Sequence, residues 1–69
     1  MKNDEAARTA GSVLRRLIKE NYPNRREFAF AFGISERTVA RYVNEGINKI
    51  TTLQELADFF HLNVREFLG

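Results

Sequence analysis

Cysteine is absent from this 69-residue chain, and histidine occurs once, at position 61. Disulfides and thiolate metal sites are therefore excluded, and His61 alone cannot hold zinc. No apolar run approaches the ~20 residues that a membrane helix requires, and the charged N-terminus is not followed by the apolar core of a signal peptide. We expect no metal, cofactor or small-molecule ligand, no membrane association, and a cytoplasmic location.

Catalytic groupings are also missing from the sequence. It shows no paired carboxylates, no nucleophile beside a base and no set of metal ligands, so we expect that the chain is not an enzyme.

The net charge of +2 is modest, but its distribution is uneven. Residues 1–24 and residues 25–49 each carry five basic and three acidic side chains, whereas residues 50–69 carry one basic and three acidic. A one-sided basic surface attracts polyanions such as nucleic acid. The alternative is an ordinary solvated surface, and charge alone does not decide between them.

Turn and capping residues divide the chain into five short helices. Residues 1–7 are polar and are expected to form a flexible tail. A helical apolar stripe runs from about Arg8 to the Asn21-Tyr22-Pro23 segment, where proline disfavours helix. Asn24 with Glu27 forms a capping box for a second helix, which ends at Gly33. Ser35 caps a third helix, which ends at Gly46.

The remaining segments predict two more helices. Either Thr51 with Gln54 or Thr52 with Glu55 opens the fourth, and Asn63 with Glu66 opens a short fifth. No stretch has the alternation of a strand, so the expected fold is all-α, a compact bundle of five short helices over residues 8–69. The expected core aromatic residues are Phe28, Phe32, Phe60 and Phe67. Phe30 is either packed against the first helix or partly exposed.

Residues 25–44 carry the functional signal. Ala29 is small enough for two helices to cross closely, and Gly33 tolerates the positive φ of a sharp turn. Ile34 fills the space under the turn, while Val39 and Tyr42 are expected to pack on Phe28 and Phe32. The helix that Ser35 begins is thus held by one edge, as in a helix-turn-helix. Such a helix fits the major groove, which is ~12 Å wide.

This spacing resembles the helix-turn-helix of the phage Cro and cI repressor family, also called the XRE family. The resemblance covers nearly the whole chain, since Gly46 and the segment 53–68 are similar to the family's closing glycine and its fourth and fifth helices. It implies a lambda-repressor-like DNA-binding fold and a transcriptional regulator, most often a repressor. Many members pair an Arg late in the first helix with a Glu before that glycine. Ile18 and Asn44 take those places here, which predicts an apolar contact and a free Asn.

Ten residues are candidate DNA contacts. Those expected at base edges are Glu36, Arg37, Thr38, Arg41 and Asn44. Those expected at phosphates are Arg25, Arg26, Ser35, Asn48 and Lys49. Arginine can bind guanine O6 and N7 as a fork. Several alternatives stay open: Arg37 and Arg41 could contact phosphates, Glu36 could serve only the helix dipole, and each basic residue could be solvated. Arg15, Arg16 and Lys19 are expected to be solvated or paired.

Duplex DNA is therefore the expected partner. One domain covers half a site, so a homodimer on a two-fold operator is expected. Its surface is assigned to the C-terminal fifth helix and the loop before the fourth helix, where apolar area comes from Ile47, Ile50, Phe67 and Leu68, unless these close the monomer core. The alternative function is a protein-binding helical module, such as an antitoxin or the partner of a regulator.

Overall fold

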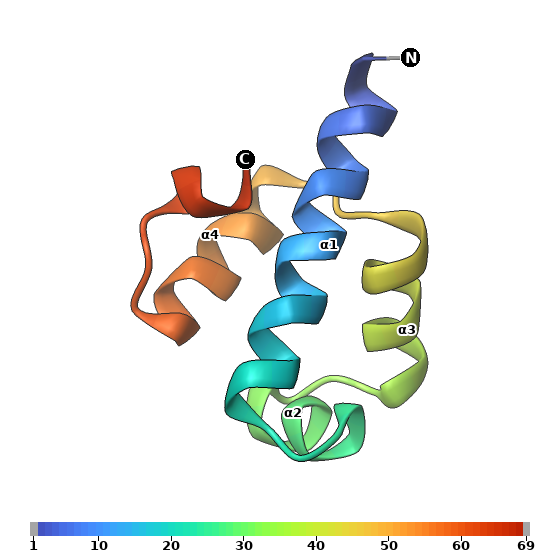
Figure 1. The fold of residues 1–69 in the computed structure, drawn as a ribbon, viewed down its shortest axis with the longest axis vertical. Coiled ribbons are helices and arrows are strands. Elements are labelled where there is room, and N and C mark those ends of the chain that lie inside the picture. The colour runs from blue at the N-terminus through green and yellow to red at the C-terminus, as the bar shows by residue number, and fades with distance from the viewer. Residues whose placement is uncertain (1, 69) are drawn as a thin grey trace.

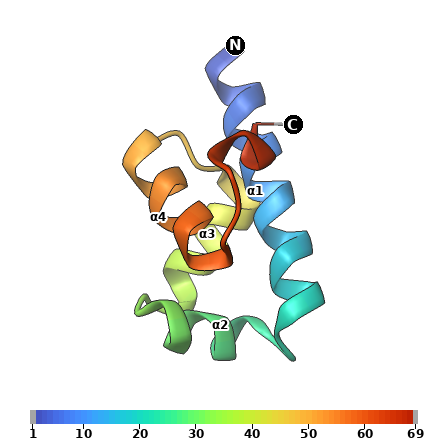
Figure 2. The same ribbon diagram turned by 90° about the vertical axis from the view of Figure 1, so that its left-hand side faces the viewer.

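The computed structural model describes the backbone of residues 2–68 and the side chains of residues 5–68. Helix α1 (Lys2–Asn21) runs along the middle of the molecule, and its first turns project beyond the other helices (Figures 1 and 2). The expected start at Arg8 was wrong. Ala7 is already buried, and its carbonyl oxygen accepts a hydrogen bond from the Ile47 amide at 3.0 Å. This tertiary contact lies within a segment that has no apolar periodicity. Met1 and Gly69, the outermost residues of the expected tail and domain, lie outside the described residues.

Helices α2 (Arg25–Phe32) and α3 (Glu36–Glu45) follow, with the caps that the sequence predicted. The Asn24 side chain accepts the Glu27 amide at 2.9 Å, and Ser35 Oγ accepts the Thr38 amide at 3.1 Å. Gly33 has a φ of 88° and donates its amide to the Ala29 carbonyl, so the chain leaves α2 through the left-handed region. These caps set both ends of the turn between α2 and α3.

The C-terminal third differs from its prediction. Helix α4 (Ile50–Phe60) has Lys49 as its N-cap residue, and the Lys49 side chain makes no capping hydrogen bond. The expected caps at Thr51 or Thr52 were therefore wrong. Asn63 does cap the next element, by accepting the Arg65 amide at 3.0 Å. That element is a short 3-10 helix, η1 (Val64–Phe67), and not a fifth α-helix. Residues 2–68 thus form a compact all-α globule of four helices plus this 3-10 turn, without a strand.

The elements are arranged around α1. In Figure 1, α3 lies on one side of α1 and α4 on the other, while α2 crosses below. Helix η1 packs against both α1 and α4 (Figure 2). The largest fully buried side chains come from every element: Phe28, Phe67, Leu14, Leu56 and Val39.

An aromatic cluster joins the end of α1, α2 and α4. The Phe28 ring stacks on Phe32 and Phe60 at centroid distances of 5.5 and 5.7 Å, and it meets Tyr22 and Phe59 edge to face. Of the expected core rings, Phe28 and Phe67 are buried while Phe32 and Phe60 are half-buried. Phe30 takes no part in the cluster, because its side chain is 87% exposed.

Two glycines allow α1 and α3 to approach closely. A Cβ atom on Gly11 would lie 2.5 Å from the Tyr42 carbonyl oxygen, and one on Gly46 would lie 2.6 Å from the Ala7 carbonyl oxygen. Both obstacles are backbone atoms, which cannot rotate away as a side chain can. Helix α3 is therefore supported by α1 along its C-terminal half, in addition to the α2 contact that the sequence indicated.

No helix among residues 2–68 combines the length and the apolar character needed to cross a membrane.

Candidate nucleic-acid interface

Helix α3 has one buried and one open face. Val39 and Val43 are buried against the core. The side chains of Glu36, Arg37, Arg41 and Asn44 are exposed, and we call these four the reading face. A hollow of about 430 Å³ runs along this face, lined by Arg37, Ala40, Arg41, Asn44 and Glu45.

Ser35 and Thr38 are occupied within the protein. Besides accepting the Thr38 amide, Ser35 Oγ lies 2.9 Å from Thr38 Oγ1, within hydrogen-bonding distance. Thr38 is half-buried. Both hydroxyl groups, which were expected to contact DNA, thus already hold the first turn of α3. These two hydroxyl groups therefore help to orient the reading face.

Asn44 is not free, in contrast to the prediction. Its Oδ1 accepts a hydrogen bond from Arg15 Nη2 of α1 at 3.4 Å. Ile18, which was expected at the family's arginine position, is buried in the core. The polar link between α1 and α3 therefore comes from Arg15, one turn earlier in the helix. The sequence reading missed it because the arginine sits outside the register that the family suggests.

A second hollow, of about 370 Å³, lies where α1 ends and α2 begins. We call it the cationic hollow; its lining consists of Arg15, Ile18, Lys19, Tyr22, Pro23, Asn24 and Arg25. Arg25 was an expected phosphate contact and is half-buried, whereas Arg26 is exposed and outside the lining. Arg15 and Lys19 were expected to be merely solvated or paired. Their i, i+4 spacing, which places them on one face of α1, was the available signal.

A third hollow, of about 280 Å³, flanks the C-terminal end of α3. It brings Arg41 together with Asn48 and Lys49, the two loop residues expected at phosphates, and both of these are exposed. Glu45 also lines it, and the sequence reading gave this residue no role. Six of the ten candidate contacts thus line these three hollows: Arg25, Arg37, Arg41, Asn44, Asn48 and Lys49. The first and third hollows share Arg41 and Glu45, and Arg15 links the second to Asn44.

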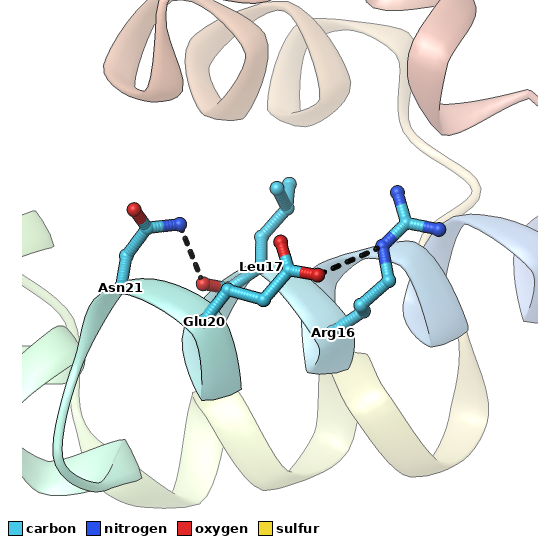
Figure 3. A network of polar contacts seen from close by, with 4 residues as sticks. All are labelled: Arg16, Leu17, Glu20 and Asn21. Atoms are coloured by element: carbon cyan, nitrogen blue, oxygen red, sulfur yellow. Dashed lines mark hydrogen bonds and ion pairs between the residues drawn. The ribbon is translucent and has the colours of Figure 1, made fainter.

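Neither Arg37 nor Arg41 forms an ion pair with a carboxylate among the described side chains. Among the described side chains, the single ion pair joins Arg16 and Glu20, whose Nε and Oε2 atoms are 3.9 Å apart (Figure 3). It lies on the surface of α1 next to Asn21, which donates to the Leu17 carbonyl. The charges of Arg37 and Arg41 therefore remain open to an external anion.

The expected dimer surface is divided by the fold. Ile47 and Phe67 belong to the monomer core, as the alternative reading held, whereas Ile50 and Leu68 are 56% and 52% exposed. The exposed pair flanks a hollow of about 330 Å³ that also includes Ala6 and Leu53.

No group of three or more potential metal ligands gathers among the residues that the structure describes. No protein-family model, no curated protein and no solved structure matches this chain.

Proposed function

We propose that this chain binds duplex DNA sequence-specifically, with α3 in the major groove, and acts as a transcriptional regulator of the repressor type. One observation carries the proposal. Helix α3 is seated on the core by Val39 and Val43 while Arg37 and Arg41 point out, without a carboxylate partner among the described side chains. The resemblance of residues 25–46 to the Cro and cI family supports the same function.

The dimensions and chemistry of α3 suit base reading. The major groove is ~12 Å wide and admits one helix. Arg37 and Arg41 lie one turn apart on the same face, so both reach successive base pairs, and the short side chain of Ala40 between them lets the groove floor approach. Each arginine can bind guanine O6 and N7 as a fork, with ~1–3 kcal/mol of discrimination. Glu36 lies in the first turn of the helix, where its negative charge also interacts favourably with the helix dipole.

Phosphate contacts would flank this reading helix. Arg25 and Arg26 open α2 on one side, and Asn48 with Lys49 follows α3 on the other. Such contacts fix the position of the helix in the groove but do not read the bases. Binding is therefore expected to weaken steeply with added salt.

The decisive experiment removes both arginines of the reading face. We expect Arg37→Ala with Arg41→Ala to lower affinity for a duplex selected from random sequence by tenfold or more, since each fork is worth ~1–3 kcal/mol. The matched control, Arg16→Ala with Arg65→Ala, removes the same charge from exposed positions outside the hollows. Affinities are measured by fluorescence anisotropy, and folding by circular dichroism. Equal losses in the two double variants would contradict base reading by α3.

A homodimer on a two-fold operator is part of the proposal. Ile50 and Leu68 offer exposed apolar area beside one hollow, which symmetric pairing of two copies would bury. A two-fold operator requires such a symmetric pair.

Protein binding remains the second candidate, and Phe30 is the observation that favours it. This ring is 87% exposed on α2, and an exposed aromatic residue suits a protein partner. The reading face of α3 carries no such residue. A Phe30→Ala variant that keeps DNA affinity would separate a docking role from the DNA-binding role.

A further inference from the structure

The cationic hollow gathers three positive charges around one opening. Arg15 and Lys19 come from the last turns of α1, and Arg25 comes from the first turn of α2. The other lining residues are Ile18, Tyr22, Pro23 and Asn24, so none of the seven is acidic. Like charges that face one hollow without a carboxylate repel each other, and an anion between them relieves that repulsion.

Arg15 connects this hollow with the reading face. Arg15 lines the hollow, and its guanidinium group donates to Asn44 Oδ1 of α3 at 3.4 Å. A guanidinium group has five N–H donors, so it can hold Asn44 and an anion at the same time.

This hydrogen bond also defines the orientation of the Asn44 amide. Arginine only donates, so the amide atom that faces Arg15 must be the oxygen. The Asn44 NH₂ group is then the one that remains available toward the groove. A bidentate bond to adenine requires both the oxygen and the NH₂ group of an Asn side chain. Arg15 uses one of the two lone pairs of the Asn44 oxygen, and the Asn44 NH₂ group is suited to acceptor edges, namely guanine O6 or N7, thymine O4 and adenine N7.

We propose that the cationic hollow binds one phosphate of the DNA backbone, and that Arg15 is a positioning residue that couples this phosphate to base reading by Asn44. The inference rests on the proposed function and deepens it, since it adds Lys19 and Arg15 to the DNA contacts and assigns acceptor edges to Asn44. It also explains why an arginine and a lysine that were expected to be solvated face the same hollow.

The phosphate contact is tested by the salt dependence of DNA binding. In the full chain, Lys19→Gln should reduce the slope of log K against log salt by about 0.9, the contribution of one neutralised phosphate, and leave the sequence preference unchanged. Arg16→Gln is the matched control, because Arg16 is near Lys19 on α1 but outside the hollow and paired with Glu20. Equal slopes for the two variants would overturn the phosphate contact.

The coupling is tested by sequence preference, which a purely structural role of Arg15 would not change. Selection from random duplexes should show that Arg15→Ala and Asn44→Ala relax preference at the same base pair of each half-site. The double variant should relax it no further, because the two residues act as one unit. An unchanged preference in Arg15→Ala would overturn the coupling.

Two further results identify what has failed. Inorganic phosphate that competes with the DNA phosphate for the hollow should weaken DNA binding more than chloride does at equal ionic strength, and Lys19→Gln should reduce this difference. Phosphate binding to the free protein that depends on Lys19, together with a DNA salt slope that Lys19→Gln leaves unchanged, would assign the hollow to a free anion and overturn the DNA assignment. If Arg37→Ala with Arg41→Ala leaves specific binding intact, then the proposed function itself has failed; if only the Lys19 and Arg15 tests fail, the proposed function stands and this inference does not.

Discussion

Gly11 is the residue at which α1 and α3 leave the least room. A methyl group there would lie 2.5 Å from the Tyr42 carbonyl oxygen, so two helix backbones would have to move apart. From the sequence alone, glycine at this position is unfavourable, because glycine within a helix lowers helix stability by ~1 kcal/mol relative to alanine. The close approach is what makes glycine necessary.

Gly11→Ala is expected to destabilise the protein by about 1–3 kcal/mol, since overpacking outweighs the gain in helix propensity. The measurement is urea denaturation followed by circular dichroism. The exposed neighbour supplies the control, because Ser12→Ala meets no such obstacle and should be neutral or slightly stabilising. A more stable Gly11→Ala variant would contradict the tight contact between α1 and α3.

His61 is the one non-glycine residue with a positive φ among residues 2–68, at 59°. It ends α4 in the left-handed region and donates its amide to the Asp58 carbonyl at 3.1 Å. An L-residue in this region is strained by ~1–2 kcal/mol. Glycine would relieve this strain, but its larger conformational entropy in the unfolded state offsets part of the gain in stability.

His61→Gly should therefore raise the free energy of unfolding by about 0.5–1 kcal/mol. His61→Ala keeps the strain while it removes the imidazole, so it should give no gain. Thermal and urea unfolding of both variants would check this, and equal stability of the two would argue against backbone strain at His61.

At the scale of elements, the cap of α3 links stability to the proposed reading face. Ser35 Oγ accepts a hydrogen bond from the Thr38 amide. This hydroxyl group therefore stabilises α3 whether or not DNA is bound. Because the cap defines the first turn, it also sets where Glu36 and Arg37 leave the helix.

Ser35→Ala is expected to cost about 1 kcal/mol of stability, whereas Ser35→Gly should cost only a few tenths, since glycine is tolerated at an N-cap. Unfolding in urea gives both values. If the two substitutions prove equally costly, the side-chain cap is not what stabilises this end of α3.

The helix boundaries show which local features could be predicted from the sequence and which could not. The caps at Asn24, Ser35 and Asn63 and the turn at Gly33 were predictable because each depends on residues within a few positions. The start of α4 was not, since its first turn has no side-chain cap and no local signal marks it. The start of α1 was missed because the polar residues before Arg8 show no periodicity, although Ala7 contacts Ile47 far along the chain.

At the scale of the whole molecule, the exposed apolar residues fall in two places. Ile50 and Leu68 share one hollow, while Phe30 stands apart on α2. The sequence had grouped Ile50 and Leu68 with Ile47 and Phe67, but the fold uses the latter two to close its own core.

Ile50→Lys with Leu68→Lys is expected to shift the chain toward monomer in sedimentation equilibrium, because charged side chains at the patch oppose its pairing. It should also weaken binding to a two-fold duplex more than to a half-site. Phe30→Lys is the control, since it removes an equally prominent exposed residue elsewhere. If Phe30→Lys shifts the equilibrium toward monomer as well, the patch is not the interface of the proposed homodimer.

What the sequence by itself determined is the set of local decisions: helix against strand, the caps at Asn24, Ser35 and Asn63, the left-handed turn at Gly33, and the amphipathic pattern that leaves Arg37 and Arg41 outside. These depend on backbone sterics and on hydrogen bonds a few residues apart. What only the tertiary structure decided is which segments meet: Gly11 with Tyr42, Ala7 with Ile47, Arg15 with Asn44, and the three cations around one hollow. Such contacts arise from packing between helices that are distant in sequence. A local sequence pattern does not predict which distant segments come together.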